Sequence, residues 1–582
     1  MQKVENIRHS LAHLLAMAVL EKFPKAKLGI GPVIENGFYY DFGGISLSPD
    51  DLPKLENKMR ELIKEKIKFE KSETDAKKAR EIFKGQQFKL ELIEELTNSP
   101  QPTAISIYKS CSESRKLKAE SCFTDLCAGP HIESTKEINP DAFKLMKIAG
   151  AYWKGSEKNP MLTRIYGVAF NTKQEFEAHL KMLEEAEKRD HRKIGKDLDL
   201  FSFHEEGSGF PFWHPKGKII FNLLTDFIRE ENKKREYGEV ATPPILNKNL
   251  WLTSGHWEKF KENMYFTEID KQEFAVKPMN CPGTILIYKE NSHSYRELPL
   301  RFAEFGLVHR HELSGVLHGL FRVRSFTQDD AHVFCAPKQL NDEILQMVDY
   351  AIDTYKKTGF GEYEIFIATK PEKYIGEDAV WERATEALAS ALKNKNIDYK
   401  IKEGEGAFYG PKIEFNVKDA IGRNWQLGTI QVDFSMPQRF SASYIDEKGN
   451  KQTPVMVHRA ILGSLERFIG VLIEHYAGAL PVWLSPTQVI VIPISEKFED
   501  YGQKVLAELK ENNIRAEIDN SNETLGKRIR SAEMQKIPYI LVVGEKEQSV
   551  NTIAVRSRKG NEDPTPLENF IERIKKEISE KK

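Results

Sequence analysis

The chain has 582 residues, of which 40% are hydrophobic and 30% are charged. This length suggests about three or four domains, and the composition is that of an ordinary soluble globular protein rather than of a membrane-embedded or disordered chain. The net charge of −1 neither requires nor excludes a nucleic-acid partner, because a local basic face can bind phosphates on a neutral protein.

The opening residues, MQKVENIRHS, lack the apolar core of a secretory signal, and no later run approaches the length of a membrane span. The chain has 5 cysteines, an odd and sparse set that does not form a disulfide framework and that fits a reducing compartment. We therefore expect a cytoplasmic protein with no membrane partner.

The pattern along the chain predicts a multidomain α+β and α/β protein. Residues 1–171 combine a helical opening with an extended run, GIGPVIENGFYYDF, which indicates an α+β domain. Residues 172–197 are charge-rich with apolar residues at helical spacing, which predicts a linker helix. Residues 198–481 alternate strand-like runs with amphipathic helices, up to the prolines of LPVWLSP. Residues 482–582 alternate strands and helices, which predicts a parallel α/β module.

Two short motifs in the first domain contain side chains that can bind a metal or move a proton. HSLAH places His9 and His13 on one face of a predicted helix, and CAGPH sets Cys127 and His131 around a Gly-Pro break. Such a set can hold zinc, and it can equally position a water molecule or a hydroxyl for hydrolysis. The residues alone leave both uses open. A third possibility is that the segment is a turn that merely buries a cysteine.

The third block contains candidates that are weak one by one. Arg310 and Glu312 lie two positions apart after an apolar strand, so both would lie on one face and could hold a phosphate and an amine. A surface ion pair is the commoner reason for such spacing. Cys281, His332 and His458 are each more often inert residues than metal ligands. The sequence has no Walker A loop and no GxGxxG motif, so nucleotide binding would need another geometry.

Taken together, these segments resemble known motifs. Motifs 1, 2 and 3 of class II aminoacyl-tRNA synthetases are similar, in order, to GEVATPPIL, RFAEFGLVHRHELSGVLHGLFRVRSFTQDDAHVFC and VMVHRAILGSLERFIG. The resemblance narrows to threonyl-tRNA synthetases through KPMNCPG, TQDDAH, WQLGTIQVDF and MVHRAILGS. It runs from the first residues to the C-terminal module.

The resemblance implies a class II catalytic domain, built on an antiparallel sheet with flanking helices, between an N-terminal editing domain and a C-terminal anticodon-binding domain. Motif 1, with Pro243, would lie at a homodimer interface. Arg310 would hold the α-phosphate of ATP and Arg467 the γ-phosphate, with Mg²⁺ sharing the charge, so positioning and charge neutralisation would carry most of the catalysis. The residues expected to bind ATP are Arg310, Glu312, Arg322, Phe326 and Arg467.

Cys281, His332 and His458 match the family's zinc ligands one by one. One thiolate and two imidazoles leave a coordination position open, which is the arrangement of a functional zinc. In this family, threonine itself fills that position through its amino group and hydroxyl. His256 matches a histidine implicated near the terminal ribose during transfer, and it is expected to be catalytic together with Arg310 and Arg467. The residues expected to line the amino-acid pocket are Met279, Gln328, Asp330, Tyr409 and Gln431.

A zinc site that expects a hydroxyl can reject valine, but serine lacks only a methyl group, which is worth about 1–3 kcal/mol of discrimination. A separate hydrolytic site is therefore expected, and the first domain resembles the family's editing domain. We favour hydrolysis of seryl-tRNA without a metal, with bound zinc as the alternative, because one signature can serve both chemistries. The residues expected in this site are His9, His13, Tyr40, Lys89, Asp125, Cys127 and His131.

The C-terminal module resembles the family's anticodon-binding domain. Asn522, Glu547 and Arg556 fall where that domain reads anticodon bases. Reading unstacked bases needs amide, carboxylate and guanidinium groups more than net positive charge, which agrees with the neutral balance of the chain. Without the resemblance, Asn522 and Glu547 would be ordinary solvated turn residues.

The resemblance therefore predicts a threonine–tRNA ligase that activates L-threonine with ATP, charges threonine tRNA and hydrolyses seryl-tRNA at a second site. A catalytically silent, synthetase-derived RNA-binding regulator is the alternative from another class, but the residues that catalysis requires are present. A prolyl or seryl synthetase is disfavoured because Cys281, His332 and His458 suit a chelating, hydroxyl-bearing amino acid. HSLAH begins almost at the first residue, so the small domain that precedes it in many family members is expected to be absent.

Overall fold

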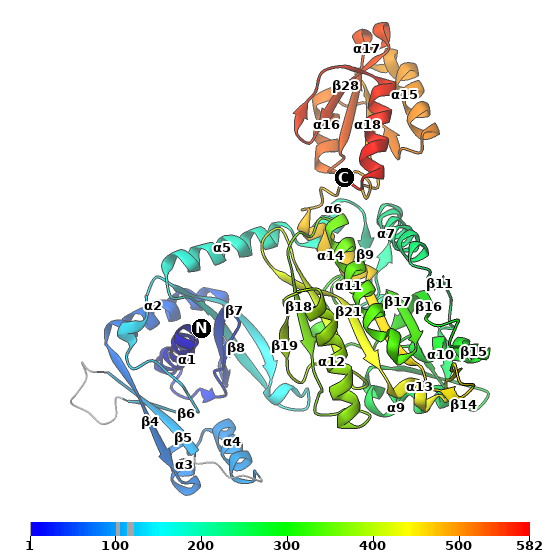
Figure 1. Ribbon diagram of the computed structural model, residues 1–582. Helices are drawn as coiled ribbons and strands as arrows, with labels where there is room; N and C mark the ends of the chain where they lie inside the picture. Colours follow the sequence, from blue (N-terminus) through cyan, green and yellow to red (C-terminus); the bar gives the residue numbers. More distant parts are fainter. Residues whose placement is uncertain (1, 100–104, 113–121) are drawn as a thin grey trace. The chain divides into compact units, whose positions relative to one another are not determined.

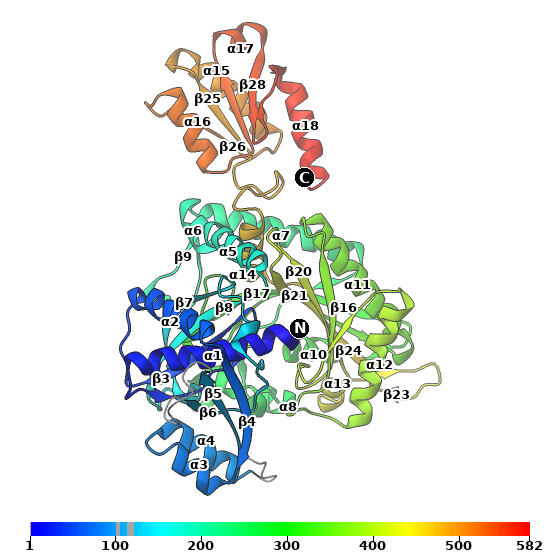
Figure 2. The same ribbon diagram turned by 90° about the vertical axis from the view of Figure 1, so that its left-hand side faces the viewer.

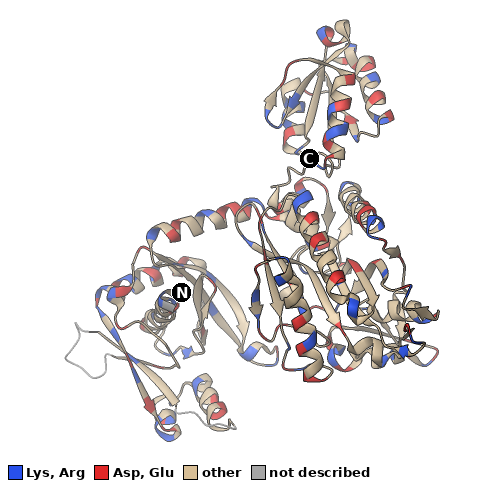
Figure 3. Cartoon of the chain, viewed as in Figure 1, with Lys and Arg blue, Asp and Glu red and all other residues tan. Residues whose placement is uncertain are grey.

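The computed structural model describes residues 2–99, 105–112 and 122–582 (Figure 1). The chain divides into two compact units, Met1–Glu184 and Glu185–Lys582. The boundary falls inside helix α5 (Lys173–Lys188), along which acidic and basic residues are mixed (Figure 3). Among the described residues, no helix is both long enough and apolar enough to cross a membrane.

The first unit is built around helix α1 (Gln2–Lys22), which packs against helix α2 (Leu52–Lys64) and against strands β3 and β8 (Figure 2). Leu11, Leu14 and Leu15 are fully buried, and their spacing is that of one helix face. This face fixes the rotation of α1 about its axis. The polar residues of the HSLAH motif are therefore held at a defined position in the unit.

Helix α1 covers a five-stranded antiparallel sheet. The strands of a smaller three-stranded sheet lie between the third and fourth strands of this sheet in the sequence. The strands of the larger sheet are β1 (Lys27–Leu28), β2 (Val33–Ile34), β3 (Gly37–Gly43), β7 (Phe143–Tyr152) and β8 (Met161–Ala169). The smaller sheet and the helices that share its core are β4 (Ile67–Thr74), β5 (Ile105–Ser112), β6 (Phe123–Leu126), α3 (Ala76–Ile82) and α4 (Gln87–Thr97).

A disulfide joins Cys111 to Cys122, which the sequence did not predict. Among the described residues this is a single bond and not a framework of several disulfides, because Cys127, Cys281 and Cys335 are free thiols. The bond follows from the β5–β6 pairing, which brings the two Cα atoms to 4.5 Å. Cysteine count alone cannot reveal such a pairing, because it depends on the register of two strands.

The second unit contains an eight-stranded sheet in the order β11–β16–β17–β24–β21–β20–β18–β19. Its outer strands are β11 (Gly238–Glu239), β18 (Tyr363–Ala368) and β19 (Lys400–Lys402). Its central pairings are antiparallel, and helices pack on it as the predicted fold class requires. The central strands are β16 (Leu300–His309), β17 (Ser325–Cys335), β20 (Lys412–Lys418), β21 (Asn424–Asp433) and β24 (Val455–Ser464). The main helices are α7 (Pro215–Lys234), α11 (Leu340–Lys357), α12 (Asp378–Asn394) and α14 (Leu465–His475).

The C-terminal part of this unit has the predicted parallel strands, flanked by helices. β25 pairs in parallel with β26 and with β27, while β28 adds an antiparallel strand that the sequence did not indicate. The elements are β25 (Val489–Pro493), α15 (Glu499–Glu511), β26 (Ala516–Ile518), α16 (Leu525–Met534), β27 (Tyr539–Val543), α17 (Glu545–Val550), β28 (Thr552–Ser557) and α18 (Leu567–Ser579).

Truncation of a core residue in α14 tests the packing of this helix. Leu472 is 0% exposed, so Leu472→Ala is expected to lower the free energy of unfolding by about 2–5 kcal/mol, because it leaves a cavity. Urea unfolding followed by circular dichroism measures this loss. The matched control is Met534→Ala on α16, where Met534 is 67% exposed. This variant is expected to change the free energy of unfolding by no more than about 0.5 kcal/mol. Equal stability of the two variants would contradict the packing.

Candidate functional site

The central sheet brings the predicted metal ligands together. His332 on β17 and His458 on β24 are directly opposite each other in the antiparallel register, and Cys281 begins helix α10 (Cys281–Lys289). The three residues are buried, and their donor atoms lie within 4.8 Å of one another. Burial lowers the pKa of His332, which keeps its imidazole in the neutral form that binds metals. Burial raises the pKa of the Cys281 thiol, a shift that a bound cation reverses. This donor set fits a zinc ion.

These donors line a cavity of about 430 Å³. The cavity wall also contains the guanidinium of Arg310, and the amino-acid pocket predicted from the sequence lies in the same wall. Predicted residues that line the cavity are Met279, Cys281, Arg310, Gln328, Asp330, His332, Tyr409, Gln431 and His458. Residues from segments far apart in the sequence therefore form one site.

Polar side chains in this wall are held by defined partners. The Tyr409 hydroxyl donates to Gln431 Oε1 at 2.6 Å, and Asn280 Nδ2 donates to Asp330 Oδ2 at 2.9 Å. Burial raises the pKa of Asp330. The sequence analysis missed Asn280, although it precedes Cys281 in KPMNCPG.

Asp433 is a second residue that the sequence analysis missed. Its Oδ2 lies 3.2 Å from Nε2 of His458, so it can orient the imidazole ring. The sequence does contain a signal for this role. Asp433 follows Gln431 by two positions on β21 and so lies on the same face of the strand.

The predicted ATP-binding residues gather around the loop between β16 and β17. Arg310 directly follows β16, donates from Nε to the Pro278 carbonyl at 3.3 Å and lies over the Phe326 ring at 5.0 Å. Glu312 and Arg322 form an ion pair with each other at 3.0 Å. The sequence indicated separate ligand contacts for these two residues and gave no sign of this pair.

Arg467 lies in the first turn of α14, where its backbone N–H donates to Ser464 Oγ at 3.1 Å. Burial and the nearby charge of Arg322 lower the pKa of Arg467. The like charges of Arg322 and Arg467 thus act against each other, and the Glu312 carboxylate that pairs with Arg322 offsets part of this repulsion. An anion bound between them, such as a triphosphate, would relieve this repulsion.

His256 is fully buried beside the cavity. Its Nδ1 lies 2.8 Å from Ser254 Oγ, and its Nε2 lies 2.9 Å from the sulfur of Met279, which lines the cavity. Burial, with a contribution from Arg310, lowers the pKa of His256 to about 3. The imidazole is therefore neutral at physiological pH.

Asp329 on β17 is hydrogen-bonded to the end of β24. The sequence did not indicate this role. The Asp329 carboxylate accepts the backbone N–H groups of Ile461, Leu462 and Gly463 at 2.8–3.0 Å. Burial raises the pKa of Asp329 to about 6. The register of the two strands shifts next to Asp329, so this carboxylate satisfies the backbone where β24 turns into α14.

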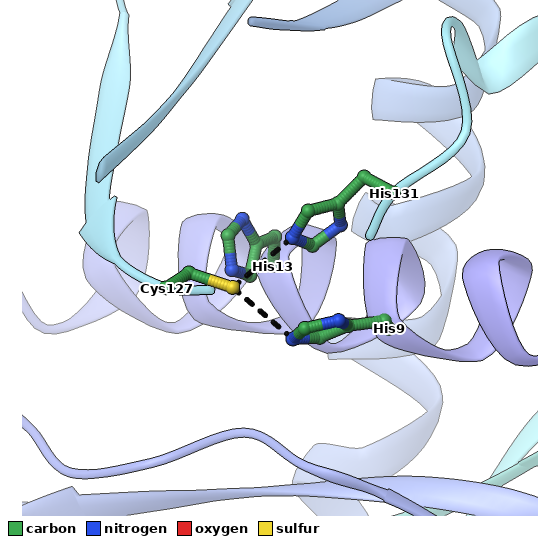
Figure 4. A group of neighbouring side chains, drawn as sticks. All are labelled: His9, His13, Cys127 and His131. Atoms are coloured by element: carbon green, nitrogen blue, oxygen red, sulfur yellow. Dashed lines mark hydrogen bonds between the residues drawn. The ribbon is translucent and has the colours of Figure 1, made fainter. Parts of the chain in front are cut away.

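The first unit brings its predicted histidines and cysteine together at one face of α1 (Figure 4). The Cys127 sulfur lies 3.2 Å from Nε2 of His9 and 3.3 Å from Nε2 of His131. With His13, the donor atoms all lie within 4.8 Å of one another. Burial raises the pKa of Cys127 to about 11 and lowers the pKa values of His9, His13 and His131. The set is thus neutral at pH 7.

Asp125 connects this cluster to the other residues predicted for the site. It accepts from the Tyr40 hydroxyl at 2.6 Å, pairs with Lys89 at 2.5 Å and lies 3.5 Å from Nε2 of His13. Lys89 and Asp125 are both buried. A cavity of about 1080 Å³, lined by His9, His13, Lys89, Asp125 and Cys127 among others, opens beside them.

The C-terminal module does not bring its three predicted residues to one place. Asn522 lines a cavity of about 440 Å³ beyond the ends of β25 and β26. Glu547 accepts the backbone N–H of Gly544 at 3.0 Å, after β27. Arg556 lies opposite Ile540, near the start of β27, and pairs with Glu533 at 2.7 Å. Arg556 thus lies toward the other end of the strands.

Comparison with known families divides the chain in three. Residues 265–476 match the tRNA synthetase class II core domain (G, H, P, S and T), and residues 488–577 match an anticodon binding domain. Residues 105–166 match the threonyl and alanyl tRNA synthetase second additional domain. These matches confirm the predicted fold class.

Known relatives are similar over nearly the whole chain. The threonine–tRNA ligase of Caldanaerobacter subterraneus subsp. tengcongensis is 54% identical over 577 residues, which cover 98% of this chain and 87% of the relative. The RNA binding domain of threonyl-tRNA synthetase from Cryptosporidium parvum Iowa II has 42% identity and a TM-score of 0.65, over 66% of this chain and 98% of that chain. A threonyl-tRNA synthetase structure from Aeropyrum pernix has 29% identity and a TM-score of 0.61, over 68% of this chain and 96% of that chain. The chain therefore belongs to the threonyl-tRNA synthetases.

Proposed function

We propose that the chain activates L-threonine with ATP and transfers the threonyl group to the 3′ end of threonine tRNA. The observation that carries this proposal is the buried set of Cys281, His332 and His458 in the wall of a cavity that also contains Arg310 and Asp330. The cavity thus combines donors for a metal with a cation for phosphate and a carboxylate for an amine. Family membership supports the same reaction.

Cys281, His332 and His458 would hold a zinc ion. The ion would supply an open coordination position that recognises the amino group and the hydroxyl of threonine together. Asp330, which accepts from Asn280 at 2.9 Å, would accept from the amino group of threonine. The Tyr409–Gln431 pair closes the same wall. Valine lacks the hydroxyl and would leave the buried polar groups unpaired.

In the activation step, a threonine carboxylate oxygen attacks the α-phosphorus of ATP, and pyrophosphate leaves. Arg310 would hold the α-phosphate, and the Phe326 ring beneath it would stack on adenine, with Glu312 on the adenine side. Arg322 and Arg467 would hold the remaining phosphates, with Mg²⁺ bound to the nucleotide. Their charges are fixed before ATP binds, so little reorganisation is needed. His256, neutral and buried, would act near the terminal ribose during transfer.

The second site would hydrolyse seryl-tRNA. His9, His13, Cys127 and His131 would position water and the terminal adenosine, with Asp125 ordered by Tyr40 and Lys89. We favour hydrolysis without a metal, in which the neutral imidazoles of His9 and His13 position the attacking water. The spacing of the donor atoms also suits zinc, so metal analysis decides.

Further partners follow from the family. We propose that Asn522, Glu547 and Arg556 contribute to anticodon recognition, and that the protein is a cytoplasmic homodimer. Ile245, next to the motif 1 prolines, and Phe266 are 44% and 46% exposed in the single chain. A second copy that covers such apolar side chains would stabilise the dimer.

Exchange of labelled pyrophosphate into ATP tests the proposed activation. We expect exchange with threonine, weaker exchange with serine, and none with valine or proline, because only the first two offer a hydroxyl beside the amino group. A zinc chelator should abolish the signal. Absence of exchange with any amino acid, in protein that contains zinc, would sink the enzyme proposal.

Replacement of one zinc ligand tests the metal assignment. Cys281→Ser is expected to reduce bound zinc at the catalytic site and to lower threonine-dependent exchange by at least about 100-fold, because the remaining imidazoles hold the ion weakly. Atomic absorption and the exchange assay measure the two losses. Cys335→Ala is the control, since Cys335 is buried on β17 but lies outside the set. Full zinc content in Cys281→Ser would argue against these ligands.

His9→Ala tests the editing site. Hydrolysis of seryl-tRNA should fall by about 100-fold, the size of a lost acid–base or water-positioning group, while threonine activation stays unchanged. His179→Ala is the control, because His179 packs on Phe170, outside the cluster. Metal analysis of His9→Ala is expected to find the same zinc content as in the wild type. Loss of one zinc per chain in that variant would show that the editing cluster binds the metal.

A further inference from the structure

We propose that His191 is a positioning residue of the ATP site, which fixes the loop that carries Arg322 to the helix that carries Arg467. This inference rests on the proposed function, in which those two arginines hold the triphosphate. His191 itself lies outside the cavity that contains Arg310 and the metal ligands. Its role would be to hold other groups in place rather than to touch a substrate.

Every polar atom of the His191 ring has a partner. His191 begins helix α6 (His191–Asp197) and is 0% exposed. Its Nδ1 lies 2.7 Å from Glu474 Oε1, and its Nε2 accepts the backbone N–H of Leu320 at 2.9 Å. An amide N–H can only donate, so Nε2 carries the lone pair and Nδ1 carries the hydrogen. The ring is thus neutral, with a single tautomer.

These contacts also exclude a metal at this position. Asp190, His191 and Glu474 have donor atoms close enough to hold an ion. However, the one lone pair of the imidazole is already used by Leu320, and Glu474 accepts from Nδ1 and from the His191 backbone N–H at 3.1 Å. The group is therefore a set of structural hydrogen bonds.

On the loop side, His191 holds the turn that precedes Arg322. The backbone of His318 and Arg322 pairs in both directions, at 3.1 and 3.3 Å, and Leu320 lies between them. The Phe321 ring packs on the imidazole with a centroid distance of 4.0 Å. Gly319 has a φ of +48°, and a Cβ there would come within 2.2 Å of His191 Nε2. The turn is thus shaped to fit this ring.

On the helix side, Glu474 lies in the last turn of α14, and Arg467 lies in the first turn. Glu474 is 3% exposed and pairs with Arg423 at 2.6 Å in addition to His191. Arg189 donates to the carbonyls of Glu474 and His475 at the helix end, at 3.3 and 2.9 Å. Because a short helix moves as a rigid rod, fixing its end also fixes Arg467.

The two arginines need such a fixed frame. Arg322 lies on a loop and Arg467 lies on α14, so their relative position depends on what joins the loop to the helix. His191 links the Arg322 turn to the Arg467 helix through one ring. If the link is lost, a smaller fraction of the protein has the ATP-binding arrangement, and the apparent affinity for ATP falls by that fraction.

Two variants at this position separate the two hydrogen bonds. His191→Asn places an amide where it can still donate to Glu474, but it leaves the Leu320 N–H without an acceptor. His191→Gln reaches the position of Nε2 and can accept from Leu320, but it loses the donor to Glu474. Both variants replace the imidazole ring by a side-chain amide, so both lose the packing of the ring. Pyrophosphate exchange gives KM for ATP at saturating threonine, and KM for threonine at saturating ATP.

We expect His191→Asn to raise KM for ATP about tenfold, because a buried donor is left unpaired, with KM for threonine changed less than about twofold. His191→Gln should stay within about threefold of the wild type for both substrates, since its acceptor replaces the bond to Leu320. Gly319→Ala leaves His191 intact but pushes the turn away, and it should also raise KM for ATP alone. This third variant keeps the test valid if His191→Asn does not fold.

The inference is overturned if the variants leave KM for ATP unchanged, or if they raise both KM values equally, as a merely structural role would. It is also overturned if His191→Gln behaves like His191→Asn. Wild-type protein that shows no threonine-dependent exchange would instead refute the proposed function, and this inference would fall with it. If the wild type catalyses threonine-dependent exchange but the variants keep the wild-type KM for ATP, the inference is refuted and the proposed function stands.

Discussion

The antiparallel pairing of β17 with β24 is the constraint on which the active site depends. Its register sets His332 opposite His458, and a slip by one residue would turn one imidazole to the other face of the sheet. Asp330 lies on the same strand as His332, and Asp329 holds the backbone at the point where β24 continues into α14. A single strand pairing thus aligns two of the three candidate metal ligands, part of the predicted amino-acid pocket and the helix that carries Arg467.

Several buried polar groups near this sheet have specific partners. Lys277 donates to Glu304 at 2.7 Å and to Thr242 at 2.8 Å. Glu304 lies opposite Asp330 in the sheet, so the motif 1 segment is connected to the amino-acid pocket through buried hydrogen bonds. Breaking one partner of such a set leaves an unpaired buried charge, which costs about 3–5 kcal/mol. This explains why charged residues are tolerated in the interior.

The sequence predicted the fold class, which the family matches confirm, and short motifs contain the residues that the structure brings together in two clusters. KPMNCPG and TQDDAH contain the ligands Cys281 and His332 within a few residues of Asn280 and Asp329, yet the latter two were missed. Their roles depend on partners far along the chain, such as Asp329 with the N–H of Leu462. The disulfide and the distance of Arg556 from Asn522 likewise follow from strand register. Local patterns identify residue types, whereas tertiary contacts decide which groups meet.

X-ray absorption at the zinc edge, with and without threonine, measures whether Cys281, His332 and His458 form a zinc site that contacts the amino acid. The account predicts one sulfur ligand at about 2.3 Å and two imidazole nitrogens at about 2.0–2.1 Å. Threonine should change the nitrogen and oxygen shell, while valine should leave it as it is. A spectrum that does not change with threonine, or a shell with several sulfur ligands, would contradict the account.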